Sequence, residues 1–244
     1  MLVEILETLK LGKHKVRAPA VCASVIGENV DAMAADIARA IEQQADIIEI
    51  RLDGLRKNSE WQTLLETELP LILTNRAGRE GGRFKGEDGA RVKYLLEGID
   101  EGVACVDIEL STPHSFLKKV VDSAKIQKTS LLLTHHDFKE TPPIATLMNI
   151  AEKMADIGCD IAKIVTFART PKDALTVLNF LNQVTSYVKV PVVAFAMGEA
   201  GRMSRIAAPI FGSPIVYAAA KETTAPGQFD VEKTRLLLHE FGLR

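Results

Sequence analysis

Asp160-Ile161-Ala162-Lys163-Ile164-Val165-Thr166 is the stretch of this chain that decides the predicted fold. It is an apolar run of the kind found in β-strands, with a single lysine in its middle. Parallel strands buried on both faces read as near-continuous runs of Val, Ile and Leu. A lysine in such a strand would lose hydration, which favours the neutral amine, and a neutral amine can form a Schiff base with a ketone or aldehyde. The alternative is an edge strand whose lysine reaches water while its stem packs.

Seven further apolar runs are spaced along the chain, and helical patterns lie between them. The predicted strands cover residues 20–25, 47–51, 71–75, 104–109, 130–135, 161–165, 192–196 and 215–219. The predicted helices cover residues 31–43, 60–68, 89–101, 115–124, 144–157, 171–185, 203–210 and 231–241. Alternation of strands and helices favours a parallel sheet, and eight such units at this length favour a closed (β/α)8 TIM barrel. A doubly wound open sheet is the alternative, but no GxGxxG follows the first strand.

Composition sets further limits on the class of protein. The chain has 244 residues, of which 47% are hydrophobic, and its formal net charge is −2. This is ordinary for a globular protein and gives no basic footprint for nucleic acid. Its 3 cysteines are scattered without a CxxC, so the pattern indicates neither a disulfide framework nor a zinc site.

The same features predict how the chain is organised and where it works. No apolar run approaches the roughly 20 residues of a membrane helix, and the first residues lack the pattern of a signal peptide. We therefore predict a cytoplasmic protein with one barrel domain over residues 1–244. Residues 1–18 would form an N-terminal extension or hairpin around Leu11-Gly12-Lys13.

Polar side chains gather where the predicted strands end. Catalytic groups of α/β barrels stand at those carboxyl ends or on the loops that follow. Arginines can grip carboxylates, a histidine can move protons near neutral pH, and a lysine can condense with a carbonyl. Together they describe imine-assisted proton abstraction from a small polyhydroxy keto acid. The residues concerned are Glu49, Arg51, Arg76, Glu80, Asp107, Glu109, His135, His136, Lys163, Arg205 and Gln228.

Structural roles are the alternative for several of these groups. Asp107 and Glu109 are two residues apart, so they share one strand face and could form internal ion pairs. His135 and His136 should point to opposite sides of their strand. Arg79 and Arg83 are expected to be solvated. No HExxH motif, clustered His and Cys, or glycine-rich phosphate loop is found, so no metal site and no cofactor are predicted.

The ordered set of these residues closely resembles the type I 3-dehydroquinate dehydratases of the shikimate pathway. The resemblance covers almost the whole chain beyond residue 18. It is carried by Ser24, Glu49-Ile50-Arg51-Leu52-Asp53, Arg76, Glu80-Gly81-Gly82, Asp107-Ile108-Glu109, His136-Asp137-Phe138, Ala162-Lys163, the segments 197–205 and 211–213, and Ala225-Pro226-Gly227-Gln228.

This resemblance implies a hydro-lyase that dehydrates 3-dehydroquinate to 3-dehydroshikimate without a cofactor, on the route to chorismate and the aromatic amino acids. Lys163 would form the imine, His136 would transfer protons, and Glu80 would orient His136. Arg205 would bind the substrate carboxylate. The remaining substrate contacts would come from Ser24, Glu49, Ile50, Arg51, Arg76, Thr224 and Gln228. The family also implies a homodimer with no nucleic-acid or membrane partner.

One departure from the family pattern is visible in the last loop. The family commonly has serine in a Ser-Ala-Pro-Gly-Gln loop, where this chain has Thr224, which keeps the hydroxyl but adds a methyl group. Two other functions remain open from the residues alone. One is a Schiff-base aldolase, which would need a phosphate site in the last two loops, and the other is a barrel that binds organic acids without turning them over.

Overall fold

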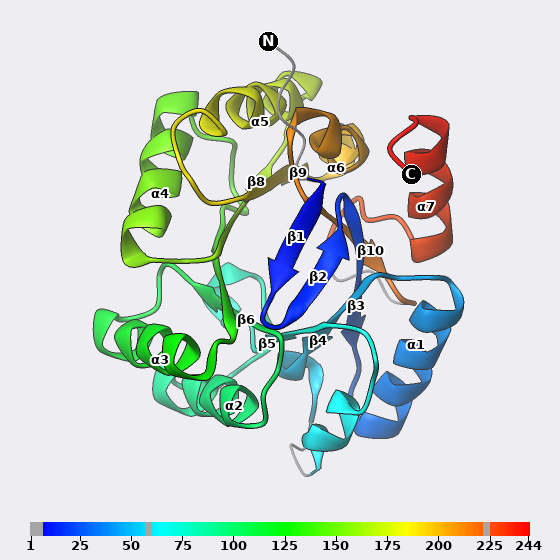
Figure 1. Ribbon diagram of the computed structural model, residues 1–244. Helices are drawn as coiled ribbons and strands as arrows, with labels where there is room; N and C mark the ends of the chain where they lie inside the picture. Colours follow the sequence, from blue (N-terminus) through cyan, green and yellow to red (C-terminus); the bar gives the residue numbers. More distant parts are fainter. Residues whose placement is uncertain (1–6, 57–59, 222–224) are drawn as a thin grey trace.

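Eight parallel strands with helices outside them form the body of the protein (Figure 1). The computed structural model describes residues 7–56, 60–221 and 225–244. The strands of this sheet are β3 (Ala20–Ile26), β4 (Ile47–Arg51), β5 (Leu71–Thr74), β6 (Cys105–Glu109), β7 (Ser130–His136), β8 (Ile161–Phe167), β9 (Val192–Met197) and β10 (Ile215–Ala219). The helices are α1 (Val30–Glu42), α2 (Asp88–Asp100), α3 (His114–Gln127), α4 (Ile144–Ile157), α5 (Pro171–Val184), α6 (Arg202–Ala207) and α7 (Val231–Glu240).

The strand order confirms the predicted barrel. Hydrogen-bonded neighbours run β10-β3-β4-β5-β6-β7-β8-β9, and every pair is parallel. The two strands at the ends of this order meet through their side chains, because the rings of Phe195 in β9 and Tyr217 in β10 have centroids 6.3 Å apart. The sheet is therefore nearly closed, and all eight carboxyl ends face one end of the barrel.

Alternate residues of each strand enter different apolar layers. One cluster fills the inside of the barrel with side chains such as Ile161, Val165, Val193 and Tyr217. The larger cluster lies between the sheet and the helices and contains the intervening residues of the same strands, such as Ile164. Because the side-chain period of a strand is two, Lys163 shares the inward face with Ile161 and Val165.

A hairpin closes the barrel at the amino ends of the strands. β1 (Thr8–Leu11) pairs antiparallel with β2 (His14–Arg17), which confirms the predicted hairpin. Leu9, Leu11 and Val16 are buried in the inner cluster. Gly12 at the turn has a φ of +55°, and its amide donates to the Ser130 hydroxyl at 2.9 Å. The hairpin thus seals the floor of the barrel with apolar side chains.

Two predicted helices differ from the structure. The helix expected at 60–68 is instead a 3₁₀ helix at Trp61–Leu65, with another at Leu52–Gly54. Only Trp61 and Leu64 of the former are buried, and a spacing of three suits the 3₁₀ repeat. The helix expected at 203–210 ends at Ala207, and a 3₁₀ helix continues it to Phe211. Pro209 explains the change, since it lacks the amide hydrogen that an α-helix would use.

Shorter elements and caps complete the chain. Further 3₁₀ helices lie at Gly78–Glu80 and Glu199–Gly201. Asn29 caps α1 by accepting from the Ala32 amide, and Gly158 ends α4 with a φ of +92°, both as the sequence predicts. Over the described ranges, none of the helices combines the length and the apolar character that a membrane crossing requires.

Candidate active site

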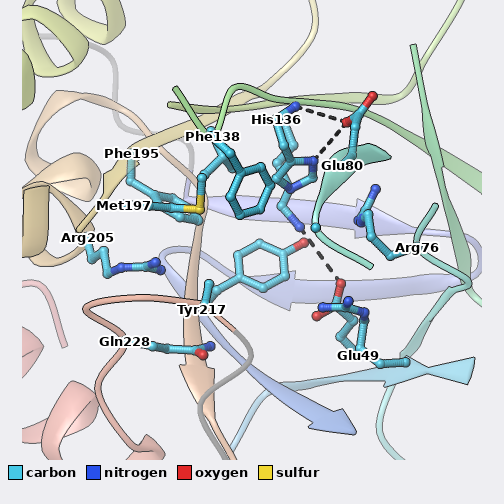
Figure 2. Close-up of a pocket in the computed structure, with 15 residues that line it drawn as sticks. Glu49, Arg76, Glu80, His136, Phe138, Phe195, Met197, Arg205, Tyr217 and Gln228 are labelled. Carbon is cyan, nitrogen blue, oxygen red and sulfur yellow. Dashed lines mark hydrogen bonds and ion pairs between the residues drawn. The ribbon is translucent and has the colours of Figure 1, made fainter. Parts of the chain in front are cut away.

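A cavity opens inside the carboxyl end of the barrel (Figure 2). Figure 2 shows Glu80 and His136 on one side, Arg205 and Gln228 on the other, and Tyr217 between them. The residues that line the cavity are Glu49, Arg51, Arg76, Glu80, Gly81, His136, Phe138, Lys163, Val165, Phe195, Met197, Arg205, Tyr217, Ala225 and Gln228. The structure therefore brings together most of the predicted site residues from six strands or the loops after them.

Lys163 stands in the middle of β8 and is 4% exposed. This excludes the edge-strand alternative, in which the ammonium would reach water. Its Nζ lies 3.5 Å from Asp107 Oδ2 and 3.8 Å from Glu49 Oε1. Nζ also lies 3.8 Å from the centroid of the Tyr217 ring. The amine is thus held inside the barrel between two carboxylates and an aromatic face.

The two carboxylates beside Lys163 are themselves held by neighbouring strands. Glu49 accepts hydrogen bonds from the hydroxyls of Ser24 and Thr74, the latter at 3.0 Å. Burial alone would raise the pKa of Asp107, but the charges of Arg76 and Lys163 keep that pKa below its usual value. Asp107 therefore stays ionised, and the position of Nζ is fixed from two sides.

Arg76 is buried in an ion-pair network at the base of the site. Its guanidinium nitrogens lie 2.6 Å from Asp107 Oδ2, 2.6 Å from the Thr134 hydroxyl and 3.0 Å from Glu109 Oε1. Arg91 extends the network, with Nη1 at 2.5 Å from Glu109 Oε2. The structural alternative for Asp107 and Glu109, an internal ion pair, is therefore what the structure contains. Arg76 reaches the cavity wall while its hydrogen bonds go to protein groups.

His136 and Glu80 form a second pair at the cavity wall. His136 Nδ1 lies 3.1 Å from Glu80 Oε2, and the His136 amide donates to the same oxygen at 3.0 Å. Ser111 donates from its hydroxyl to Glu80 Oε1 at 2.5 Å. An Nδ1–H donated to this carboxylate leaves the Nε2 lone pair available as an acceptor. The arrangement matches a base with its orienting group.

The environment keeps His136 neutral. Burial lowers the pKa of His136 well below its usual value, and the positive charges of Arg76 and Lys163 lower it further. Burial also raises the pKa of Glu80. A neutral imidazole inside the cavity can take a proton from a bound molecule. His135, by contrast, pairs with Ile164 in the register of β7 and β8 and does not line the cavity, which confirms that the two histidines point apart.

The glycines after Glu80 allow the loop to approach two side chains closely. Gly81 has a φ of +77°, and a Cβ there would meet the Phe138 ring at 2.1 Å. A Cβ on Gly82 would lie 1.9 Å from the carbonyl oxygen of Arg76. Only glycine fits such positions without displacing backbone or ring atoms. The Glu80-Gly81-Gly82 motif thus holds Glu80 against His136 under the Phe138 ring.

Arg205 lies on the opposite wall, at the end of α6, and is 3% exposed. Its Nη2 donates to the carbonyl oxygen of Pro226 at 2.9 Å, and its guanidinium carbon lies 4.4 Å from the Phe195 ring centroid. In the described part of the chain no carboxylate forms an ion pair with it, and burial lowers the pKa of Arg205 to about 10. Among the described residues, this side of the cavity therefore carries a positive charge without a carboxylate partner.

Of the other residues predicted to contact the substrate, some line the cavity and some do not. Arg51 lines the cavity but donates through Nε and Nη2 to Asp53 at 2.8 and 2.9 Å. Gln228 lines the cavity and is buried. Ile50 is fully buried in the layer between sheet and helices, so its side chain does not reach the cavity. Thr224 lies outside the described residues.

Several apolar residues of the site escaped the sequence analysis. Val165, Phe195, Met197 and Tyr217 line the cavity, and they sit on the inward faces of β8, β9 and β10. Their positions follow the two-residue period of each strand, so inward alternation from Lys163 could have found Val165. For β9 and β10 the sequence carries no polar residue that marks which alternate set faces inward. Among the described residues no group of three or more His, Cys, Asp or Glu side chains is placed to hold a metal ion.

Fold and site together define an α/β-barrel enzyme with a buried lysine and a carboxylate-oriented histidine at the carboxyl ends of the strands. The family model for type I 3-dehydroquinase matches residues 21–243. The chain belongs to this family of lyases. Of the three functions considered from the sequence, family membership favours the dehydratase over the Schiff-base aldolase and over the barrel that only binds organic acids.

Relatives and solved structures agree with this assignment. A 3-dehydroquinate dehydratase of Methanothermobacter thermautotrophicus is 36% identical over 223 residues, which cover 90% of this chain and 96% of the relative. One of Methanococcus maripaludis is 35% identical and covers 91% of this chain and 100% of the relative. The structure is similar to that of the 3-dehydroquinate dehydratase of Geobacillus kaustophilus, with a TM-score of 0.89 and 25% identity over 99% of this chain and 98% of the other.

Proposed function

We propose that the protein dehydrates 3-dehydroquinate to 3-dehydroshikimate through an imine formed on Lys163. The observation that carries this proposal is the position of the Lys163 amine inside the cavity, with a neutral His136 on one wall and, on another, an Arg205 that has no carboxylate partner among the described residues. A keto acid would meet a nucleophile for its ketone, a base for its adjacent carbon and a cation for its carboxylate. Membership of the type I 3-dehydroquinase family supports the same reaction.

The covalent step begins at the ketone. Lys163 Nζ passes a proton to the neutral His136 and attacks the carbonyl carbon with the freed lone pair; His136 then returns the proton to the hydroxyl of the carbinolamine, which leaves as water and gives the protonated imine. Asp107 and Glu49, at 3.5 and 3.8 Å, hold Nζ in place for this attack. The protonated imine then draws electrons from the neighbouring carbon, so that the hydrogen on that carbon becomes acidic.

Elimination is assigned to His136. Its Nε2 takes the proton from the carbon next to the imine, and the electron pair of that C–H bond moves into the imine to give an enamine. The enamine then re-forms the imine: its electrons make a double bond to the next carbon as the bond from that carbon to its hydroxyl breaks. The proton held by His136 joins the hydroxyl, which leaves as water. Hydrolysis of the conjugated imine releases the product and restores Lys163. Glu80, 3.1 Å from Nδ1, keeps the ring oriented throughout.

The test is trapping of the covalent intermediate. Wild-type protein incubated with 3-dehydroquinate and borohydride should gain the mass of reduced ligand on the peptide that contains Lys163, and the conjugated product should absorb in the ultraviolet. Lys163→Ala should form no adduct and lose nearly all turnover, because the nucleophile is absent. Full turnover by Lys163→Ala would overturn the imine mechanism, and wild-type protein without turnover would overturn the reaction itself.

Two other properties stay predictions, the first implied by the family resemblance and the second by the sequence pattern. One is assembly as a homodimer, which sedimentation analysis would test. The other is a cytoplasmic location.

A further inference from the structure

Tyr217 places an aromatic ring in the centre of the cavity. It stands in the middle of β10 and is 5% exposed. One ring contact is with the Lys163 amine, whose Nζ lies 3.8 Å from the Tyr217 centroid. Figure 2 shows the ring reaching across the site between Arg205 and Glu49, with its hydroxyl turned towards the interior of the cavity. The ring therefore lies against the amine that we assign to the covalent step.

The hydroxyl of Tyr217 is buried, and in the described part of the chain it has no hydrogen-bond partner. Burying a hydroxyl without a partner is unfavourable, and the great majority of buried polar side-chain atoms are paired. The strands around it could have held a phenylalanine at no such cost. An unpaired donor that faces a cavity indicates a partner that arrives with the ligand.

The charge around the ring decides which role the hydroxyl can take. Burial raises the pKa of Tyr217 well above its usual value, and the negative charge of Glu49 raises it further. The hydroxyl therefore keeps its proton and can donate it in a hydrogen bond. An acceptor oxygen on the ligand is the complementary group.

We propose that the Tyr217 hydroxyl donates a hydrogen bond to an oxygen atom of the substrate beside the carbon that bonds to Lys163. This inference rests on the proposed function and adds a substrate contact to it. The ring that carries this hydroxyl packs on Nζ, which lies 3.8 Å from the ring centroid, so a ketone bonded to the amine would lie next to the ring. The hydrogen bond would align the ketone and its neighbouring hydroxyl-bearing carbon with the amine.

A structural role and a substrate role for this hydroxyl make opposite predictions for stability. If it served the fold, its removal would cost a protein hydrogen bond and lower the melting temperature of the free protein. Because it has no protein acceptor in the described chain, Tyr217→Phe should leave that temperature unchanged or raise it. The loss should fall on binding and turnover instead.

The experiment compares Tyr217→Phe with Tyr187→Phe, which removes a hydroxyl from a side chain that is 68% exposed and is not among the lining residues. For both variants and wild type we would measure kcat and KM with 3-dehydroquinate, the Kd for 3-dehydroshikimate and the melting temperature. One neutral hydrogen bond corresponds to roughly a 2- to 10-fold loss. Tyr217→Phe should lose that much in kcat/KM and in product affinity with no fall in melting temperature, while Tyr187→Phe should match wild type.

Two results would overturn the inference. Unchanged kcat/KM and unchanged product affinity in Tyr217→Phe, beside an active wild type, would show that the hydroxyl makes no substrate contact. A lower melting temperature with unchanged product affinity would assign the hydroxyl to the fold. Failure of the proposed function is distinguishable from both, because then the wild type itself would not turn over 3-dehydroquinate.

Discussion

Two buried arginines of this barrel should respond in opposite ways to the same substitution. Arg91 is 1% exposed, and its guanidinium lies 2.9 Å from Asp88 and 2.5 Å from Glu109. Arg205 is 3% exposed and has no carboxylate partner in the described ranges. Arg205→Met and Arg91→Met are therefore a matched pair, because each replaces a buried guanidinium with an unbranched apolar side chain.

The magnitudes follow from these contacts. Burial lowers the pKa of Arg205 from 12.5 to about 10, which corresponds to about 3 kcal/mol against the charged form. The substitution also removes the hydrogen bond to the Pro226 carbonyl, which for a charged donor contributes about 1.5–3 kcal/mol. The free energy of unfolding of Arg205→Met should thus rise by about 0–2 kcal/mol. Arg91→Met breaks a buried ion pair and should lower it by about 3–5 kcal/mol.

Thermal unfolding and kinetics check both halves of this reasoning. At this chain length 1 kcal/mol shifts the melting temperature by about 2–4 °C, so Arg205→Met should melt at or above wild type and Arg91→Met at least about 6 °C below it. Loss of one partner of a buried charge pair costs about 2 kcal/mol or more, so kcat/KM of Arg205→Met should fall by at least about 30-fold. An Arg205→Met protein as destabilised as Arg91→Met, or one with wild-type kcat/KM, would refute the argument.

The remaining predictions concern the base. His136→Ala should slow elimination and imine hydrolysis by roughly 10²–10⁴-fold, so that intact mass shows an adduct accumulating, whereas His135→Ala should behave nearly as wild type; the reverse pattern would assign the base to His135. Because burial lowers the pKa of His136, kcat/KM should keep its plateau as the pH falls through about 6.5, and an acid limb at or above that value would contradict this. As the pH falls below about 6.5, His136 takes up a proton in the unfolded chain before it does so in the folded protein. The free energy of unfolding in urea should therefore decrease there in wild type, and decrease less in His136→Gln. Equal dependence on pH in the two proteins would contradict this prediction.

Much of the fold could be predicted because each strand repeats the same local pattern. Near-continuous apolar runs such as 161–165 indicate strands buried on both faces, and eight such runs alternating with helical patterns predict the barrel. Where the prediction failed, the chain lacked a full helical period: Trp61 and Leu64 alone are buried in the segment expected as a helix. Pro209 was visible in the sequence, yet the hydrophobic pattern around it runs on through the 3₁₀ helix.

The polar half of the site was easier to predict than the apolar half. Lysine, histidine and arginine at strand ends are rare enough to stand out, so Lys163, His136 and Arg205 could be placed at one end of the barrel. Tyr217 sits in an apolar strand where its ring could equally face the helices. Ile50 shows the converse case: a motif of consecutive residues includes side chains on both strand faces, and the Ile50 side chain belongs to the outer layer.

The two sides of the cavity carry different charges, and this difference should determine how an anionic ligand is oriented. Lys163 lies next to Asp107 and Glu49, so its side of the cavity holds two carboxylates whose oxygens can accept hydrogen bonds from hydroxyl groups. Arg205 lies against the Phe195 ring, and no carboxylate of the described ranges pairs with it. A ligand carboxylate placed beside Asp107 would be repelled by its negative charge, and this repulsion is strong because Asp107 is buried. The ligand carboxylate should therefore turn to Arg205, which directs the uncharged ring hydroxyls, and the ketone between them, towards Lys163.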